Sequence, residues 1–466
     1  MHTNFSKLTP LYRFTTKVVL LYSYGFILIA MGQVVLAEST NEYTARRDTS
    51  LLNSIGVNSS IDSRGETLAE TVKCINYLGM RWIRSGIEGN VPISELISLH
   101  NQTGVKFSWS PGSGGSNLAK LLSTAKEMAA GGALLSFEGP NEPNNWGITY
   151  NGVQGGRGHS WMAVADFQRD LYKAVKSDPI LKKYPVWSIS EEGAEADNVG
   201  LQFLKIPNGV HTLMPPGTIY GDDANVHNYI YHPNSPGLND NKTWNAADPT
   251  SACRVDGLYG EYGLTWAKHY QGYTQAQLLT LPRVTTETGC LIEGQVTQKI
   301  QALNLLSMYL DQFTRGWNHT AVYLLRDRVD EAGNQKFGFY RPDYTPRLSA
   351  IYLHNLTTIL ADSGKLTKPG KLYYTLQEEP PTVHHLLLEK SDGEFDLIVW
   401  DERLSGDDNI TVNFGTRHAN VSLFDPTVGT QQLKNYEKCK SLQLVLSDHP
   451  MVIAIPPANR PKVIIR

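Results

Sequence analysis

Cysteine is scarce in this chain, and its copies lie far apart. Only 4 cysteines occur in 466 residues. None belongs to a C-x-x-C pair or lies beside a His-rich motif, which is the spacing that structural zinc sites use. We therefore expect neither a metal nor an organic cofactor. Four cysteines allow three disulfide pairings, among which the sequence does not choose. They are Cys74, Cys253, Cys290 and Cys439.

Charged residues are also few, and neither sign dominates. They make up 19% of the chain, and 42 Lys and Arg against 45 Asp and Glu leave a net charge of −3. A nucleic-acid-binding protein usually shows a basic excess or stripe, so we expect no nucleic-acid partner. The apolar share of 41% is ample for a core and excludes a disordered chain. Aromatic residues reach 10%, and their faces stack on sugars as readily as they fill cores.

A long apolar run occurs only near the N-terminus, over residues 18–37. It follows a positive lead that contains Lys7, Arg13 and Lys17, and this order is typical of a secretory signal peptide. The Ala37–Glu38 junction resembles a cleavage site, but the run is also long enough to stay in a bilayer as an anchor. We expect residues 1–37 to be a signal peptide or a membrane anchor, and the protein to be secreted, periplasmic or on the cell surface.

Residues 51–364 alternate short apolar runs with amphipathic stretches. The stretch 68–78, for example, repeats apolar residues at helical spacing and stops at Gly79. Strands that are nearly all apolar and alternate with helices predict a parallel sheet covered by helices, the α/β class. Eight such units over about 300 residues match a (β/α)8 TIM barrel. The expected strands are 54–58, 81–84, 106–109, 133–139, 186–190, 224–229, 283–288 and 321–325.

The last hundred residues have a different pattern. From residue 365 to 466, short alternating runs are separated by Asp, Gly, Asn and Pro, which predicts a C-terminal antiparallel β-sandwich domain. The lead-in segment 38–50 is expected to add a strand to it. Segment 231–262 is rich in Pro, Gly, Asn and Asp and is long for a connection, so we expect a lid or a binding loop there. The expected runs are 373–376, 384–389, 395–400, 410–414, 419–424, 442–446 and 451–455.

Two glutamates follow strands at the end of a barrel where reactive groups belong. Glu142 lies in EGPNEP, residues 138–143, just beyond the fourth strand, and Glu287 lies in TETG, residues 286–289, ending the seventh. A lone glutamate at a strand end is more often a solvated loop residue or an ion-pair partner. Two that face each other across a cleft are what glycoside hydrolysis needs: one protonates the leaving oxygen, and the other attacks the anomeric carbon or activates water.

This combination resembles the retaining (β/α)8 glycoside hydrolases of clan A, and most closely glycoside hydrolase family 39. The resemblance covers roughly residues 50–460. It rests on NEP at 141–143, on TETG at 286–289, on the count of strands and on the C-terminal sandwich. It implies a double displacement in which Glu287 is the nucleophile and Glu142 the general acid and base.

The resemblance also implies roles for neighbouring residues. Asn141 matches a residue that hydrogen-bonds the sugar 2-hydroxyl, and Arg84 matches an arginine that lies under the nucleophile and keeps it ionised. His227 and Tyr229 match a His-x-Tyr pattern whose tyrosine contacts the nucleophile. The chain departs from the pattern at the eighth strand, VYLLR at 322–326, which lacks the tryptophan that many clan members place beneath the bound sugar.

Three further residues are candidates for sugar binding. Trp146 and Trp109 lie at strand ends on the side of the barrel mouth, where a ring could stack on a sugar or pack in the core. Glu138 lies four residues before Glu142, so strand alternation points both to the same side. Glu138 could bind sugar, could raise the pKa of Glu142, or could be a buried support.

The sequence therefore predicts an exported retaining glycoside hydrolase that cleaves β-glycosidic bonds in a polysaccharide or oligosaccharide. Two other functions would use the same cleft: a catalytically silent carbohydrate-binding protein, and a transglycosylase that passes the sugar to another acceptor. The identity of the polymer, endo or exo action and the oligomeric state stay open.

Overall fold

The computed structural model describes residues 40–457 except 62, 88–90, 192–198, 232–236, 251, 254–268, 331–334 and 365–367. The expected signal peptide or anchor, residues 1–37, lies outside the described residues, as does much of the expected loop 231–262. Within the described part of the chain, no helix has the length and apolarity needed to cross a membrane.

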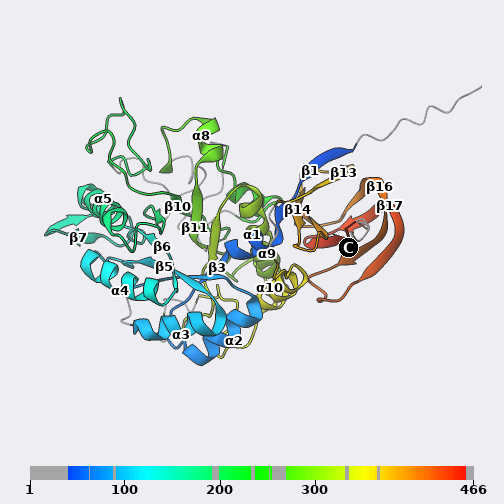
Figure 1. Cartoon of the computed structure of the whole chain (residues 1–466), viewed down its shortest axis with the longest axis horizontal. Coiled ribbons are helices and arrows are strands. Elements are labelled where there is room, and N and C mark those ends of the chain that lie inside the picture. The colour runs from blue at the N-terminus through cyan, green and yellow to red at the C-terminus, as the bar shows by residue number, and fades with distance from the viewer. Residues whose placement is uncertain are drawn as a thin grey trace, which may run out of the picture. The chain divides into compact units, whose positions relative to one another are not determined.

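Eight parallel strands form one sheet (Figure 1), and they follow one another round it in chain order, with the first beside the eighth. An isolated bridge from Trp187 to Asp223 nearly closes the ring between the fifth and sixth strands. The sheet is a (β/α)8 barrel, so the predicted fold class is confirmed. Its strands are β3 (Ile55–Asn58), β4 (Trp82–Gly86), β5 (Lys106–Ser110), β6 (Leu134–Glu138), β9 (Val186–Trp187), β10 (Ala224–His227), β11 (Arg283–Thr288) and β12 (His319–Val322).

Helices with one apolar face cover this sheet, and their ends follow the capping residues in the sequence. The helix α2 begins after Thr67, whose side chain accepts a hydrogen bond from the Glu70 amide, and ends at Gly79 with φ 69°. Asn117 caps α4 in the same way through the amide of Lys120. The covering helices are α2 (Leu68–Leu78), α3 (Ile93–Thr103), α4 (Leu118–Ala130), α5 (Met162–Ser177), α8 (Gln275–Thr280), α9 (Gln298–Thr314) and α10 (Leu348–Ile359).

A second, largely antiparallel sheet contains the C-terminal strands and two N-terminal ones. Strand β1 pairs with β13, and β2 lies parallel to β14. The long strand β16 pairs with β13 near its start and with β18 near its end. The expected runs 410–414 and 419–424 therefore form one strand. The members are β1 (Asn41–Thr44), β2 (Arg46–Arg47), β13 (Lys371–Gln377), β14 (Val383–Glu389), β15 (Phe395–Asp401), β16 (Asp408–Phe424), β17 (Lys434–Leu446) and β18 (Pro450–Ile455).

The second sheet has an apolar core of its own, and it also contributes side chains to the core of the barrel. Leu386, Ile398 and Trp400 of the second sheet belong to the same buried cluster as the helices and strands of the barrel. The two sheets therefore pack against each other through apolar contact as well as hydrogen bonds.

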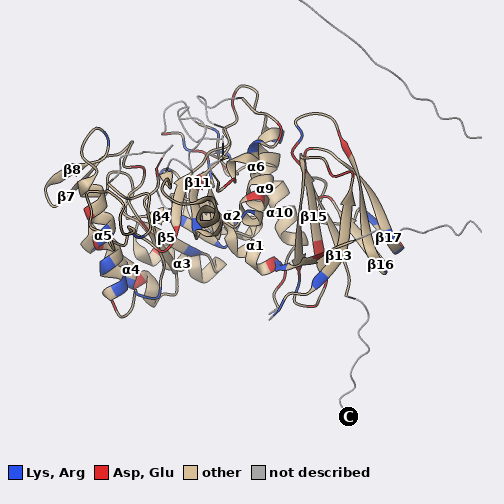
Figure 2. Cartoon of the chain, turned by 90° about the horizontal axis from the view of Figure 1, so that it is seen from above, with Lys and Arg blue, Asp and Glu red and all other residues tan. Residues whose placement is uncertain are grey.

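Acidic and basic side chains are interspersed on the helices and loops of the described residues (Figure 2), in keeping with the near-balanced charge.

Candidate active site

The two glutamates lie where the carboxyl ends of the barrel strands meet. Glu142 follows β6 in a tight turn, in which its carbonyl accepts hydrogen bonds from the amides of Asn145 and Trp146, both at 2.8 Å. Its φ of 40° lies in the left-handed region, which costs energy for a residue with a side chain and is found mainly at functional sites. Glu287 lies in β11, directly beside His227 of β10 in the strand register.

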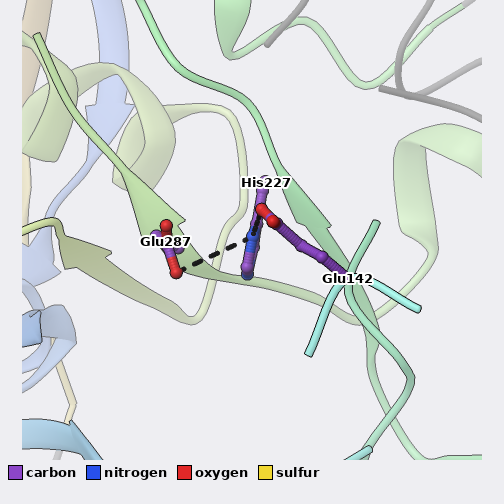
Figure 3. A group of neighbouring side chains, drawn as sticks. All are labelled: Glu142, His227 and Glu287. Atoms are coloured by element: carbon purple, nitrogen blue, oxygen red, sulfur yellow. Dashed lines mark hydrogen bonds and ion pairs between the residues drawn. The ribbon is translucent and has the colours of Figure 1, made fainter. Parts of the chain in front are cut away.

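His227 lies between the two carboxyl groups (Figure 3). Its Nδ1 is 2.7 Å from Glu142 Oε1 and 3.9 Å from Glu287 Oε2. All three groups bring a nitrogen or oxygen atom within 4.8 Å of one another, so the carboxyl oxygens of Glu142 and Glu287 face each other across a gap of at most that size. Asn145 Nδ2 donates a further hydrogen bond to Glu142 Oε2 at 3.1 Å.

Arg84, in the middle of β4, donates hydrogen bonds to three residues at once. Its Nη1 donates to Glu287 Oε2 at 2.7 Å, and its Nη2 donates to Asn141 Oδ1 at 2.6 Å. Nε and Nη2 together hold both oxygens of Glu138, at 2.9 and 2.7 Å. Such a bidentate, charge-assisted pair has a fixed geometry. Arg84 therefore lies under Glu287 and aligns it with Asn141.

The other face of Glu287 is held by Tyr229, whose hydroxyl donates a short hydrogen bond to Glu287 Oε1. Thr286, one residue earlier, lies 3.1 Å from the Nε2 of His227 and donates to Glu138 Oε1 at 2.9 Å. With the threonine proton used for Glu138, the Nε2 of His227 is the donor to Thr286. This bond keeps Nδ1 of His227 directed at Glu142.

The two carboxyl groups differ in their environment. Burial raises the pKa of Glu287, and the Glu142 charge adds to the rise, whereas His227, Arg84 and the Tyr229 hydroxyl oppose it. Burial acts on Glu142 in the same direction and is the largest single effect, but the hydrogen bond and charge of His227, the hydrogen bond from Asn145 and the charge of Arg84 together outweigh it and lower the pKa of Glu142. Because the two sites interact strongly, they titrate as a pair.

A cleft of about 630 Å³ opens above these groups. Its walls are mostly hydroxyl, amide and guanidinium groups, with aromatic rings at its floor and rim, as expected of a site for a polar ligand with apolar faces. Trp146 lies at the rim with 49% of its surface exposed. The lining includes Asn58, Ser60, Arg64, Arg84, Ser110, Asn141, Glu142, Trp146, Tyr229, Glu287, Tyr323, Arg328 and Phe337.

The structure brings most of the predicted site residues together, but it corrects Trp109. That side chain is 1% exposed and donates from Nε1 to Thr124 of α4 at 2.9 Å. Strand alternation explains the difference: Ser110 lines the cleft, so Trp109, one residue earlier, faces the helices. The expectation that Trp109 contacts substrate is wrong.

Glu138 also lies outside the lining of the cleft. It is fully buried, and its two oxygens are held by Arg84 and Thr286, which is the arrangement of a support. Of the alternatives that the sequence left open, sugar binding by Glu138 is therefore excluded. Glu191, four residues after β9, is likewise buried and paired with His269 at 2.7 Å.

Two aromatic residues that line the cleft were not predicted from the sequence. Tyr323, which directly follows β12, and Phe337 pack edge to face with ring centroids 5.5 Å apart, and Phe337 also packs on Tyr229. Trp317 is buried among apolar residues beside β10 and lies outside the cleft. The tyrosine in VYLLR was visible as an aromatic residue at the end of the eighth strand, but the position of Phe337 depends on a loop fold that carries no local signal.

The residues Glu142, His227 and Glu287 have the donor types of a metal site, and their atoms are close enough for one cation. The guanidinium of Arg84, 2.7 Å from Glu287, would repel a cation there. Hydrogen bonds from Arg84, Tyr229, His227 and Asn145 already satisfy the carboxyl oxygens. The geometry is explained by acid–base groups alone.

No family model and no curated protein sequence matches this chain. Among solved structures, it is similar to a family 39 glycoside hydrolase from the gut symbiont Bacteroides cellulosilyticus, with a TM-score of 0.55 and 16% identity over 88% of this chain and 82% of that one. It is similar to a family 51 arabinofuranosidase from Xanthomonas axonopodis, with a TM-score of 0.55 and 13% identity over 89% and 99%.

A family 30 endoxylanase from Clostridium papyrosolvens gives a TM-score of 0.53 and 13% identity, with 91% of this chain and 98% of that chain covered. At sequence identities this low, similarity between two structures shows a shared fold and not a shared activity. The barrel with its second sheet is therefore similar to the fold of family 39, 51 and 30 enzymes, and the resemblance inferred from the sequence is confirmed at that level.

Proposed function

We propose that this chain is a retaining glycoside hydrolase that cleaves β-glycosidic bonds in a polysaccharide or oligosaccharide. The observation that carries the proposal is the pair Glu142 and Glu287, with carboxyl oxygens within 4.8 Å across the cleft. Inverting enzymes keep their carboxyl groups about 6.5–9.5 Å apart to admit a water molecule, whereas retaining enzymes keep them about 5–5.5 Å apart. The short separation supports direct attack by one carboxylate on the sugar.

In the first step, a Glu287 oxygen attacks the anomeric carbon and forms a glycosyl ester while the bond from that carbon to the leaving oxygen breaks. The leaving oxygen takes a proton from the Glu142 carboxyl group, whose Oε1 lies 2.7 Å from His227 Nδ1. Arg84 and Tyr229 hold the two oxygens of Glu287, which fixes the direction of attack. Glu142 is the acid of this step.

In the second step, Glu142 is ionised and takes a proton from water. The water oxygen bonds to the anomeric carbon as the ester bond to Glu287 breaks, which restores the Glu287 carboxylate. Asn141 is held by Arg84 at 2.6 Å and lines the cleft. We assign its amide to the sugar 2-hydroxyl, a contact that strengthens as positive charge develops on the ring.

The names of the similar structures support a polysaccharide such as a xylan or a glucan as the substrate class, since they include an endoxylanase and a bifunctional glucanase-xylanase. We further propose that residues 1–37 direct export, so that the enzyme meets its polymer outside the cytoplasm. This part of the proposal rests on the charged lead and the apolar run at 18–37.

The test is turnover of a panel of β-linked polysaccharides by the purified protein and by two variants. Glu287→Gln removes the nucleophile and Glu142→Gln the acid, and each is expected to lower kcat by about 10²–10⁴-fold on natural polymer. Normal circular dichroism in both variants serves as the control for folding. Full activity in either variant, or binding without turnover by the wild type, would contradict the proposal.

A further inference from the structure

A second pair of carboxylic acids lies where the barrel meets the C-terminal sheet. Asp311 of α9 is fully buried, and its Oδ1 accepts a hydrogen bond from Trp400 Nε1 of β15 at 3.0 Å. The carboxyl group of Glu402, one residue past β15, lies against that of Asp311. The pair therefore joins α9 to the sheet.

Glu402 also holds the short helix α6 (Lys242–Ala246), which belongs to the connection after β10. Glu402 Oε2 accepts hydrogen bonds from the amides of Thr243 and Trp244, at 3.1 and 3.0 Å. The carbonyl of Glu402 accepts from the amide of Asn241 at 3.1 Å. The ring of Trp244 stacks on His384 of β14 with centroids 3.8 Å apart. The start of α6 is thus fastened to the C-terminal sheet.

The end of α6 reaches the active site. The carbonyl of Ala246 accepts a hydrogen bond at 2.8 Å from Nδ2 of Asn228, the residue between His227 and Tyr229. The Oδ1 of Asn228 accepts from Gln312, the neighbour of Asp311 in α9, at 3.3 Å. Each acid of this pair is therefore connected to Asn228, Glu402 through α6 and Asp311 through Gln312, its neighbour in α9.

We propose that Glu402 is a positioning residue, which acts from the C-terminal sheet through α6 and Asn228 to orient His227 and Tyr229 against Glu142 and Glu287. The inference rests on the proposed function, and it gives the second sheet a part in catalysis. His227 contacts Glu142 at 2.7 Å, and Tyr229 contacts Glu287. A displacement of a reacting group by about 1 Å can lower the rate about 10²-fold. The orientation of both residues must therefore be fixed by the residues packed around them.

The same sheet offers a matched control. Asp396 of β15 is fully buried and lies against a second buried acid, Asp48 of α1 (Asp48–Ser54), while Lys390 Nζ lies 3.1 Å from it. These partners lie outside the cleft. Asp396→Asn therefore disturbs a buried acid pair between barrel and sheet without touching the connection to Asn228. A purely structural role of Glu402 would make the two sites behave alike.

The experiment compares Glu402→Ala, Glu402→Gln and Asp396→Asn with the wild type, by kcat, KM and Tm on the polysaccharide found in the panel. Glu402→Ala is expected to lower kcat about tenfold or more with KM within about twofold. Glu402→Gln keeps an oxygen for the two amides of α6 and is expected to restore most of kcat. Asp396→Asn is expected to change Tm and leave kcat unchanged.

A wild-type kcat in Glu402→Ala, or an equal loss of kcat in Asp396→Asn or Glu402→Gln, would overturn the inference. If Glu402→Ala does not fold, Asn228→Ala cuts the same connection and must show the loss of kcat with KM kept. The nuclear magnetic resonance signal of the His227 ring separates this result from failure of the proposed function. It must shift in Glu402→Ala and stay in place in Asp396→Asn even if the wild type turns over no sugar.

Discussion

The hydroxyl of Tyr229 is expected to have a large effect on the pH dependence of kcat/KM. Its hydrogen bond lowers the pKa of Glu287, against the larger effect of burial, which raises it. Glu287 reacts only when ionised, so protonation of this residue sets the acid limb of kcat/KM. Since the net shift is upward, we expect that limb above the ordinary glutamate value of 4.5.

Tyr229→Phe should therefore move the acid limb to higher pH and lower kcat/KM about tenfold at neutral pH, since a hydrogen bond to a charged group is worth roughly 1.5–3 kcal/mol. The measurement is the pH profile of kcat/KM for both enzymes. Tyr150→Phe is the control, because the Tyr150 hydroxyl donates to Asp170, which does not line the cleft. An acid limb that stays in place in Tyr229→Phe contradicts the role given to this hydroxyl.

Trp146 is exposed at the rim of the cleft, where a sugar ring could cover it. Trp146→Ala should raise KM about tenfold, equivalent to about 1.4 kcal/mol of lost binding, and change kcat little, because its side chain is not among the groups that hold the carboxylates. The control is Val153 of β8 (Val153–Gly155), which is 54% exposed. Val153→Ala should leave KM and kcat unchanged. Steady-state kinetics on oligosaccharides of increasing length would show the effect, and an unchanged KM would remove Trp146 from the binding site.

The site residues that sequence reasoning brought together share a simple feature. Glu287 lies near the carboxyl end of β11, Glu142 follows β6 and Arg84 lies in β4, and a parallel barrel gathers the carboxyl ends of its strands at one mouth. The direction of a side chain within a strand is harder to predict, because a shift of one residue reverses it. Trp109 was misplaced for that reason, and Tyr323 and Phe337 were missed because they depend on how the chain turns after β12.

At the scale of elements, the contact between α1 (Asp48–Ser54) and β15 contains the acids Asp48 and Asp396. Burial, followed by the charge of Asp396, raises the pKa of Asp48 to about 9. An acid whose pKa rises on folding favours the folded state while it is protonated. Its contribution is complete below the unfolded value of 3.8 and is lost as the pH rises toward about 9.

We therefore expect the free energy of unfolding of the wild type to fall between mildly acidic pH and pH 9, and Asp48→Asn to flatten this curve. The asparagine variant should be more stable than the wild type at pH 8, because its amide stays neutral. Urea unfolding at several pH values measures both effects. Glu127→Gln, on the exposed face of α4, should reproduce the wild-type curve; a wild-type curve for Asp48→Asn would show that Asp48 does not titrate in this way.

At the scale of the whole molecule, hydropathy patterns were enough to predict the barrel. Eight apolar runs separated by amphipathic stretches allow few folds other than a closed parallel sheet, and all eight strands are found within a few residues of their expected positions. The hydropathy pattern failed where a stretch with the composition of a turn lies inside a paired strand. The polar stretch Gly415–His418 reads as a turn, yet β16 continues through it with a shift in register against β17, because long-range pairing outweighs local propensity.

The central claim is that Glu287 attacks the sugar directly, and the stereochemistry of the first product tests it most directly. Proton nuclear magnetic resonance during hydrolysis of a β-linked oligosaccharide, recorded before mutarotation, identifies the anomer released by the enzyme. Two displacements at the same carbon predict that the β-anomer forms first and the α-anomer follows slowly. An α-anomer that forms first would mean inversion by an activated water, and it would contradict the mechanism assigned to Glu142 and Glu287.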